Sequence, residues 1–261
     1  MGFKRKRRWG GRPKLSNIVG QVADAVKDVK DEVKDRIDSR EEALIRRSER
    51  ALILFSEFGE EAEERPYKWL YSGIEKSSIG IGMALAASYG EVRVINGANA
   101  TLDGLVDVLE GLLADGDIFE IDMLHHAHGE DGEACFVDRN VAWADVQAAI
   151  GALGAGDRLR MFYTTSCWGY GLARAMVNAG FSCGSGAVGV NTNAAGEYGA
   201  FIKYWQTLRP FDTAVRRAFQ GSGWRVSDAA AIKMDKRFAA ANSQKRCYGD
   251  GSVNIRTNAD D

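Results

Sequence analysis

Short apolar runs alternate with amphipathic helical stretches through most of this chain, and this alternation is the feature that most limits its fold. The expected strands lie at residues 51–55, 92–95, 118–124, 159–163 and 185–190. Between them, apolar residues recur at three- and four-residue steps, as in residues 100–113, where Thr101 is a suitable N-cap. Strands that alternate with helices in this way predict an α/β fold, with helices on both faces of a mostly parallel sheet.

The same patterns predict the remaining elements. Helices are expected at residues 67–89 with glycine interruptions, 143–153, 171–179, 199–206, 212–219 and 226–241. A short strand is expected at residues 135–137, and the last dozen residues are expected to form a polar tail.

The N-terminal part of the chain has a different composition. Seven Lys or Arg residues and no acidic residue lie within residues 1–14. A charged helical stretch follows, in which one narrow apolar stripe is formed by Ile18, Val22, Val26, Val29, Val33 and Ile37. We therefore expect a basic tail and amphipathic helical segment at 1–47 and a main domain at 48–261. The basic start reads as a solubilising tail, with anionic lipid, nucleic acid or an acidic partner as alternatives.

Residues 15–47 are the candidate for self-association or for docking of a partner, with packing on the main domain or on a membrane surface as alternatives, because so narrow a stripe cannot form a core alone. The net charge of −2 does not indicate a specific nucleic-acid partner. No apolar run approaches the ~18 residues that span a bilayer, so no transmembrane segment is expected. The four cysteines have no clustered spacing, and no secretory signal is visible. These features predict free thiols and a cytoplasmic location.

Two short motifs end neighbouring strands of the expected sheet. His128-Gly129 follows the apolar run 118–124, and Ser166-Cys167 follows the run 159–163. In sheets of this kind, catalytic groups gather at the carboxyl ends of the strands. An imidazole and a thiol at these positions are suited to act as the base and the nucleophile of a cysteine hydrolase.

The order of these motifs resembles that of the caspase-like cysteine peptidases of clan CD, which include caspases, metacaspases, gingipains, legumains and separases. The resemblance covers roughly residues 48–220 and includes the acidic, glycine-rich turn 130–132 between the motifs. Residues 179–181 and 186–189 are similar to bacterial and metacaspase-type members. The resemblance implies a three-layer α-β-α caspase-like fold and a cysteine endopeptidase that hydrolyses peptide bonds through a Cys-His dyad.

The resemblance also implies the roles of individual residues. Cys167 would be the nucleophile and His128, directly before glycine, the general base and acid. The N–H groups of Gly129 and Cys167 would form the oxyanion hole. The implied substrate-binding residues are Thr165, Ser166 and Trp168. Two residues before the cysteine, caspases have a glutamine and several relatives an acid; Thr165 carries no charge there, so it indicates no charge preference for the substrate.

Other interpretations of the same residues remain open. His126 and His128 share a face and are candidates for a zinc site, although solvated or packed histidines account for them as well. Glu130, Asp131 and Asp138 are candidates for calcium binding, whereas a solvated acidic loop is the simpler interpretation. No cofactor is expected otherwise, and the partner is a protein or peptide substrate.

Two different functions compete with the peptidase. One is a catalytically silent caspase-like scaffold that presents its N-terminal helix to a partner protein. The other is a flavodoxin-like nucleotide-binding module, which lacks support because no glycine-rich phosphate loop follows residues 51–55. If the peptidase interpretation holds, regulation by the N-terminal segment or by proteolytic processing is expected. Glu57 and Glu60 are candidates for determining substrate specificity.

Overall fold

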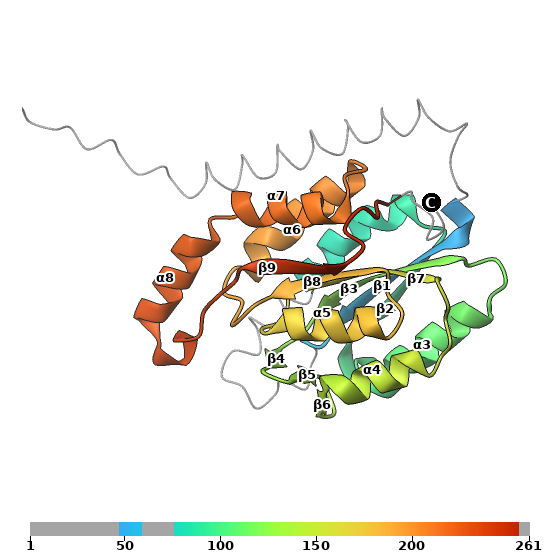
Figure 1. Ribbon diagram of the computed structural model, residues 1–261, viewed down its shortest axis with the longest axis horizontal. Coiled ribbons are helices and arrows are strands. Elements are labelled where there is room, and N and C mark those ends of the chain that lie inside the picture. The colour runs from blue at the N-terminus through green and yellow to red at the C-terminus, as the bar shows by residue number, and fades with distance from the viewer. Residues whose placement is uncertain (1–46, 59–75, 256–261) are drawn as a thin grey trace, which may run out of the picture. The chain divides into compact units, whose positions relative to one another are not determined.

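The computed structural model describes residues 47–58 and 76–255, drawn in colour in Figure 1. The expected basic tail, the amphipathic segment up to residue 46 and the part of the predicted helix at 67–75 lie outside the described residues. All elements below belong to the main domain. The first of them is a 3-10 turn, η1 (Arg47–Glu49), which leads directly into the sheet.

A six-stranded sheet forms the centre of the domain. Its strands are β1 (Arg50–Ser56), β2 (Glu91–Ile95), β3 (Glu120–His126), β7 (Leu159–Thr164), β8 (Cys183–Ala187) and β9 (Lys245–Gly249). They are ordered β2-β1-β3-β7-β8-β9, and all neighbours are parallel except β8 and β9. The mostly parallel sheet expected from the alternating pattern is therefore confirmed, and its parallel strands place their carboxyl ends at one edge.

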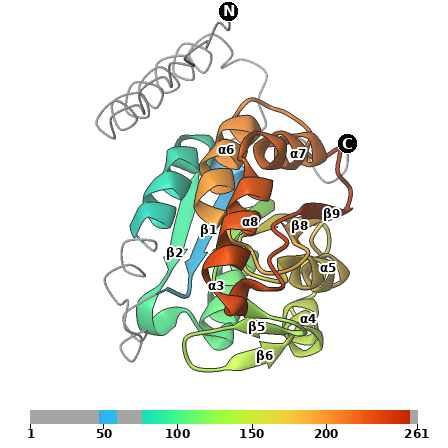
Figure 2. The ribbon, with the colours of Figure 1, turned by 90° about the vertical axis from the view of Figure 1, so that its left-hand side faces the viewer.

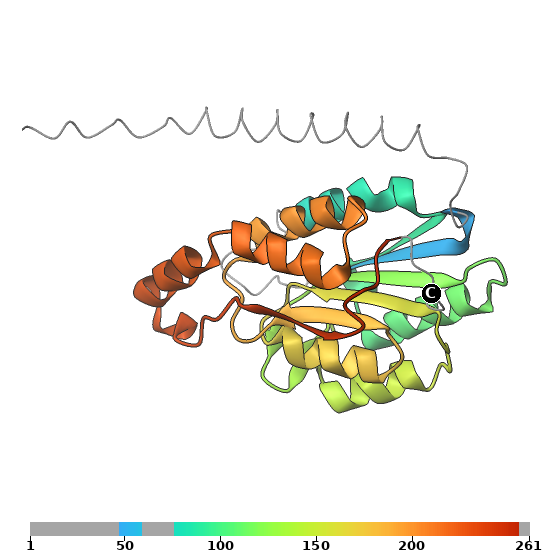
Figure 3. The ribbon, with the colours of Figure 1, turned by 45° about the horizontal axis from the view of Figure 1, so that its top comes forward.

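Helices cover both faces of this sheet, as Figures 1 and 3 show. One face packs against α3 (Leu102–Ala114), α4 (Trp143–Gly151) and α5 (Gly169–Asn178). The opposite face packs against η3 (Met83–Ser88), α6 (Ala194–Gln206) and α7 (Phe211–Gly221). Alternation along β1 assigns Phe55 to the first face and Leu54 to the second. The three-layer α/β fold class is thus confirmed.

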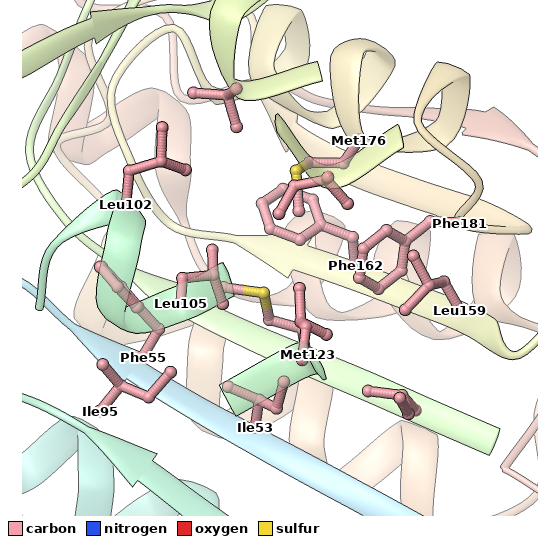
Figure 4. Close-up of a cluster of buried hydrophobic side chains, with 14 of the residues drawn as sticks. Ile53, Phe55, Ile95, Leu102, Leu105, Met123, Leu159, Phe162, Met176 and Phe181 are labelled. Carbon is pink, nitrogen blue, oxygen red and sulfur yellow. The ribbon is translucent and has the colours of Figure 1, made fainter. Parts of the chain in front are cut away.

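The apolar core on the α3 side is built as the periodicity predicted. Leu102, Leu105, Leu109 and Leu112 of α3 are all buried there. Figure 4 shows Leu105 beside Met123 of β3 and Phe55 of β1 in this core. Thr101 caps the helix as expected, since its hydroxyl oxygen accepts a hydrogen bond from the N–H of Gly104 at 2.9 Å.

A second, small sheet lies between β3 and α4 in the sequence. It consists of β4 (Gly129–Glu130), β5 (Glu133–Cys135) and β6 (Asn140–Ala142), paired antiparallel in that order. Figure 2 shows it next to α4, apart from the main sheet. Only one short strand was expected here, at 135–137, because two- and three-residue strands leave no periodic pattern.

Some boundaries differ from the expectation. β3 begins and ends two residues later than predicted, because Phe119 is 57% exposed whereas His125 and His126 are buried within the strand. The run predicted as one helix at 226–241 is α8 (Trp224–Met234) followed by the turn η5 (Lys236–Phe238). A further short turn, η4 (Gly97–Asn99), follows β2.

The expected polar tail is wrong for the residues that the structure describes. β9, which directly precedes the last dozen residues, pairs with β8. After it, Val253 and Ile255 are buried against the core under α7. Single apolar residues separated by polar ones carry no visible pattern. The pairing of β9 with an existing edge strand brings them to the core instead.

Candidate functional site

β3 and β7 leave the sheet side by side. His125 of β3 is paired with Thr164 of β7, and the N–H of Thr165 donates to the carbonyl of His125 at 3.0 Å. His128 and Cys167 each follow three residues after this pair. The parallel register therefore brings the two motifs to the same level at the carboxyl edge of the sheet.

Gly129 lies directly against the backbone of Cys167. A Cβ atom at position 129 would collide with the carbonyl oxygen of Cys167 and would lie 3.2 Å from Cβ of Ser166. Any residue with a side chain would push the two loops apart. The backbones of the His-Gly and Ser-Cys motifs are thus in contact, as the order of the motifs led us to expect.

A carboxylate holds His128 from the end of β1. Oε2 of Glu57 accepts a hydrogen bond from the backbone N–H of His128 at 3.0 Å and lies 2.7 Å from its Nδ1. The ring of Phe58 packs edge-on against the same imidazole, at 4.6 Å between ring centroids. Glu57 reaches this position because its N–H donates to the carbonyl of His126 at 2.9 Å, which continues the β1–β3 pairing past the strand ends.

This contact determines which imidazole nitrogen is available for chemistry. An ionised carboxylate only accepts hydrogen bonds. Nδ1 of His128 therefore carries a hydrogen and donates a hydrogen bond to Oε2 of Glu57. Nε2 then carries the lone pair of the ring, the feature that accepts a proton from a thiol. From the sequence, Glu57 was predicted only as a candidate for determining substrate specificity. Its position after β1, level with the start of the His128 loop, was the available signal for an orienting role; Glu60 lies outside the described residues.

The three neighbouring histidines have different environments. His125 and His126 are 2% and 6% exposed, whereas the side chain of His128 is 25% exposed. Burial lowers the pKa of His125 to about 3. Burial, together with the nearby charges of His125 and Lys245, lowers the pKa of His126 to about 3. Both remain neutral parts of the interior at neutral pH, and only His128 combines exposure with an orienting carboxylate.

Cys167 lies in the loop that follows β7 and is partly buried. Burial raises the pKa of its thiol, and three smaller influences lower it: the backbone N–H of Asn191, the positive charge of Lys245 and the backbone N–H of Cys167 itself. The Asn191 N–H donates to Sγ at 3.4 Å. The first residue of α5 is Gly169, so the positive end of that helix begins two residues after the thiol and also favours a thiolate.

The residue after the cysteine has a strained backbone. Trp168 adopts the left-handed conformation with φ of 54°, which costs a residue with a Cβ roughly 1–2 kcal/mol. Its N–H donates to the carbonyl of Gly189 at 2.8 Å, which helps to hold this conformation. This turn allows α5 to begin at the next residue, Gly169. The backbone of Gly169 lies so close to Gly186 of β8 that a side chain at position 186 has no room. The half-buried indole of Trp168 remains a candidate for substrate contact.

Thr165 and Ser166 make their side-chain contacts inside the protein. Oγ1 of Thr165 shares a hydrogen bond with Nδ1 of His126 at 2.7 Å, and Oγ of Ser166 shares one with Oγ1 of Thr164 at 2.8 Å. Both residues are almost completely buried. The Thr165 bond ties the end of β7 to β3, and the Ser166 bond stays within the end of β7. An interaction of either residue with substrate would therefore rest on its backbone atoms.

The remaining sequence expectations concern metals, membranes and disulfides. Within residues 47–58 and 76–255, no group of three or more His, Cys, Asp or Glu side chains is arranged to hold a metal ion. In the same part of the chain, no helix is long and apolar enough to cross a membrane. Cys135, Cys167, Cys183 and Cys247 are all free thiols.

Comparison with known proteins gives a limited likeness. No family model and no curated protein matches this chain. Among solved structures, it is similar to the X-ray structure of iotapain, a secreted C11 cysteine protease from Bacteroides thetaiotaomicron. The two share 12% sequence identity with a TM-score of 0.38, over 60% of this chain. The match spans 57% of the protease, little more than half of its length.

Proposed function

We propose that this protein is a caspase-like cysteine endopeptidase, of the metacaspase and bacterial type, in which Cys167 is the nucleophile and His128 the general base and acid. The observation that carries the proposal is the contact between Gly129 and the backbone of Cys167, which joins the two motifs at the carboxyl edge of the sheet. The hydrogen bonds from His128 to Glu57 add the orienting group that a catalytic imidazole needs.

The proposed reaction uses each of these groups in turn. Nε2 of His128 takes the proton of the Cys167 thiol, and the thiolate attacks the carbonyl carbon of the peptide bond. The N–H groups of Gly129 and Cys167 stabilise the oxyanion that forms. The imidazolium then gives its proton to the departing amine, leaving a thioester. A water molecule, deprotonated by the same imidazole, hydrolyses the thioester and restores the thiol.

The environment of the thiol explains why this chemistry needs a base. Burial raises the pKa of Cys167, so the thiol form prevails in the free protein at neutral pH. Glu57 stabilises the imidazolium that arises when His128 accepts the proton, as the carboxylate of a catalytic triad does. We therefore extend the expected dyad to a triad of Cys167, His128 and Glu57.

The other parts of the proposal concern context. We propose that the enzyme needs no cofactor, so that cleavage is equal in EDTA and in calcium. We also propose that it acts in the cytoplasm, where its thiols stay reduced, and that residues 15–47 mediate self-association or the docking of a partner. Regulation by this segment or by proteolytic processing belongs to the same proposal.

Substitution of the nucleophile is the first test. Wild type and Cys167→Ala are assayed against peptide libraries, with Cys247→Ala as the control because Cys247 is also a partly buried free thiol. We expect cleavage by the wild type and the control only, together with iodoacetamide labelling of Cys167 but not of Cys135 or Cys183. Cleavage that survives in Cys167→Ala overturns the assignment. A wild type without cleavage or labelling favours the silent scaffold.

The orienting role of Glu57 has a separate test. Glu57→Gln keeps a side chain of the same shape but removes the charge that stabilises the imidazolium. We expect kcat to fall by about tenfold or more, with the roughly 10²–10⁴-fold contribution of a general acid–base group as the upper bound, while KM changes little. Glu49→Gln, at the opposite end of β1, is the control and leaves kcat unchanged. A Glu57→Gln enzyme with the wild-type kcat shows that His128 does not depend on this carboxylate.

A further inference from the structure

Asn191 connects the thiol to the interior of the protein. It lies in the loop between β8 and α6, and its backbone N–H donates to Sγ of Cys167 at 3.4 Å. Its side-chain Nδ2 donates to the carbonyl of Thr165 at 2.8 Å and to Oε1 of Glu197 at 2.9 Å. Its Oδ1 accepts from the N–H of Asn193 at 3.1 Å. Every polar group of the side chain is engaged, so the direction of the backbone N–H is held from three sides.

A buried ion pair holds the carboxylate that binds Asn191. Glu197 of α6 and Lys245 of β9 are in contact at 2.8 Å between Oε1 and Nζ, with both side chains almost inaccessible to solvent. Nζ of Lys245 also donates to the carbonyl of Thr164 at 2.6 Å and lies over the ring of Tyr163. Oε1 of Glu197 thus accepts hydrogen bonds both from the ammonium group of Lys245 and from the side-chain amide of Asn191.

The side chains of Asn191 and Lys245 both bind the end of β7. Asn191 holds the carbonyl of Thr165, and Lys245 holds that of Thr164, the residues directly before the Ser166-Cys167 motif. A charged interior pair is costly to desolvate and gains little net stability. Because the Glu197–Lys245 pair lies next to the residues that lead into Cys167, it is placed to hold the loop that carries Cys167 rather than to stabilise the core.

We propose that Asn191 is a positioning residue, which keeps a backbone N–H on the Cys167 sulfur because the buried Glu197–Lys245 pair and the carbonyl of Thr165 clamp its side chain. The inference rests on the proposed function only in taking Cys167 as the nucleophile. A hydrogen bond to the charged form of a group stabilises that form, so the fixed N–H favours the thiolate over the thiol. Burial opposes it.

The charged groups of this region must be separated from the effect of Asn191. Lys245 of β9 acts on the thiol through its charge and pairs with Glu197 of α6, while His128 and Glu57 pair with each other after the ends of β3 and β1. Lys245 acts on the thiolate through its charge, whereas Asn191 acts through a neutral N–H. A useful experiment therefore removes the clamp and the charges independently.

The test measures the pH dependence of iodoacetamide alkylation of Cys167 in the full-length protein, followed by mass spectrometry of the Cys167 peptide. This readout needs no peptidase activity, so it stands even if the proposed function fails. We expect Asn191→Ala to move the alkylation profile to higher pH and to slow alkylation at pH 7 about tenfold, the effect of losing one charge-assisted hydrogen bond. Asn191→Asp keeps the Oδ1 acceptor but lacks both donors, and we expect the same direction of change.

Two comparisons make the result decisive. Asn193→Ala removes a side chain from the same loop, one that donates to Oγ of Ser222 at 2.6 Å, and it should leave the profile unchanged. Lys245→Met with Glu197→Gln removes both charges but keeps an acceptor for Asn191, so it should shift the profile less than Asn191→Ala does. The proposal is overturned if Asn191→Ala and Asn191→Asp both retain the wild-type profile. It is also overturned if Asn193→Ala or the double variant shifts the profile as far as Asn191→Ala.

Discussion

One face of the central sheet packs against α3, α4 and α5 through a cluster of aliphatic and aromatic side chains, whereas the face under η3, α6 and α7 also encloses two groups of buried charges. Arg160 of β7 binds Asp122 and Glu120 of β3, and Glu120 also pairs with Arg50. The Glu197–Lys245 pair lies on the same side, nearer the carboxyl edge.

The position of Arg160 on this face depends on one irregularity in the sheet. Ile121 of β3 pairs with Leu159 of β7, but the next residue, Asp122, pairs with Met161, so Arg160 is an extra residue in β7. A bulge of this kind re-aims a side chain. It allows Arg160 to reach Asp122, whose Oδ2 also accepts from the hydroxyl of Tyr89 at 2.5 Å. The α3 face is thus held mainly by apolar packing, whereas the α6 face also depends on the compensation of its buried charges.

The largest expected effect comes from breaking the charged network. Arg160→Met leaves Asp122 without its buried counter-ion and Glu120 with Arg50 alone, so we expect the free energy of unfolding to fall by about 3–5 kcal/mol. Urea titration measures it, with Arg174→Met on the exposed side of α5 as a control. Replacing Asp122 with Leu in the Arg160→Met protein should restore part of the loss. If Arg160→Met costs less than about 1 kcal/mol, the two faces do not differ in this way.

The packed face responds to a loss of volume instead. Leu109 of α3 is completely buried, and Leu109→Ala should lower the free energy of unfolding by about 2–5 kcal/mol through lost burial and the cavity left behind. The cost should be the same at low and high salt, whereas the cost of Arg160→Met includes an ionic contribution. Val108→Ala, at a partly buried neighbouring position, is the milder control. A salt-dependent cost for Leu109→Ala contradicts the description of this face as apolar packing.

Acid should weaken both faces through their buried histidines. His125 stacks on Phe55 of the α3 face and His126 packs against Tyr198 of the α6 face. The pKa of each falls from 6.5 to about 3 on folding, so below pH 6.5 the unfolded chain binds more protons than the folded one. Stability therefore decreases as the pH falls from 6.5 toward 3, by about 1.4 kcal/mol per pH unit for each histidine.

Urea titrations between pH 7 and pH 5 measure this slope. His125→Phe keeps an aromatic ring against Phe55 and removes one titrating group, so the slope should decrease by about 1.4 kcal/mol per pH unit relative to the wild type. An unchanged slope in that variant means that His125 is not held neutral by burial.

The smallest expected effect tests a local feature of the packed face. Thr101→Ala removes the oxygen that accepts from the N–H of Gly104, so stability should fall by about 1 kcal/mol. Thr101→Ser keeps the cap and serves as the control. Thermal unfolding distinguishes them, and equal melting temperatures for the two variants show that the cap does not stabilise α3.

The elements of the α3 face follow closely from local sequence patterns. Apolar residues at helical spacing predicted α3 and its buried leucines, and the Thr101 cap was evident from the residue type at the helix start. The α6 face was less predictable. Simple alternation along β7 assigns Arg160 to the face opposite Met161, and only the bulge between neighbouring strands brings it to the same side.

The candidate site divides in the same way. His128, Gly129 and Cys167 were singled out because they end apolar runs in a recognisable order. Glu57, Asn191 and the Glu197–Lys245 pair are far apart in the sequence and follow no motif. They meet only because β1, β8, α6 and β9 are packed around the ends of β3 and β7.

The sequence by itself determined the alternating α/β architecture, the two motifs and the edge of the sheet at which they lie, because hydrophobic period and strand ends are local properties of a chain. Only the tertiary structure decided which histidine is held by a carboxylate, that Thr165 turns inward to His126, and what surrounds the thiol. Those contacts depend on strand register, on a single bulge and on loops that meet across the sheet, which no local pattern encodes.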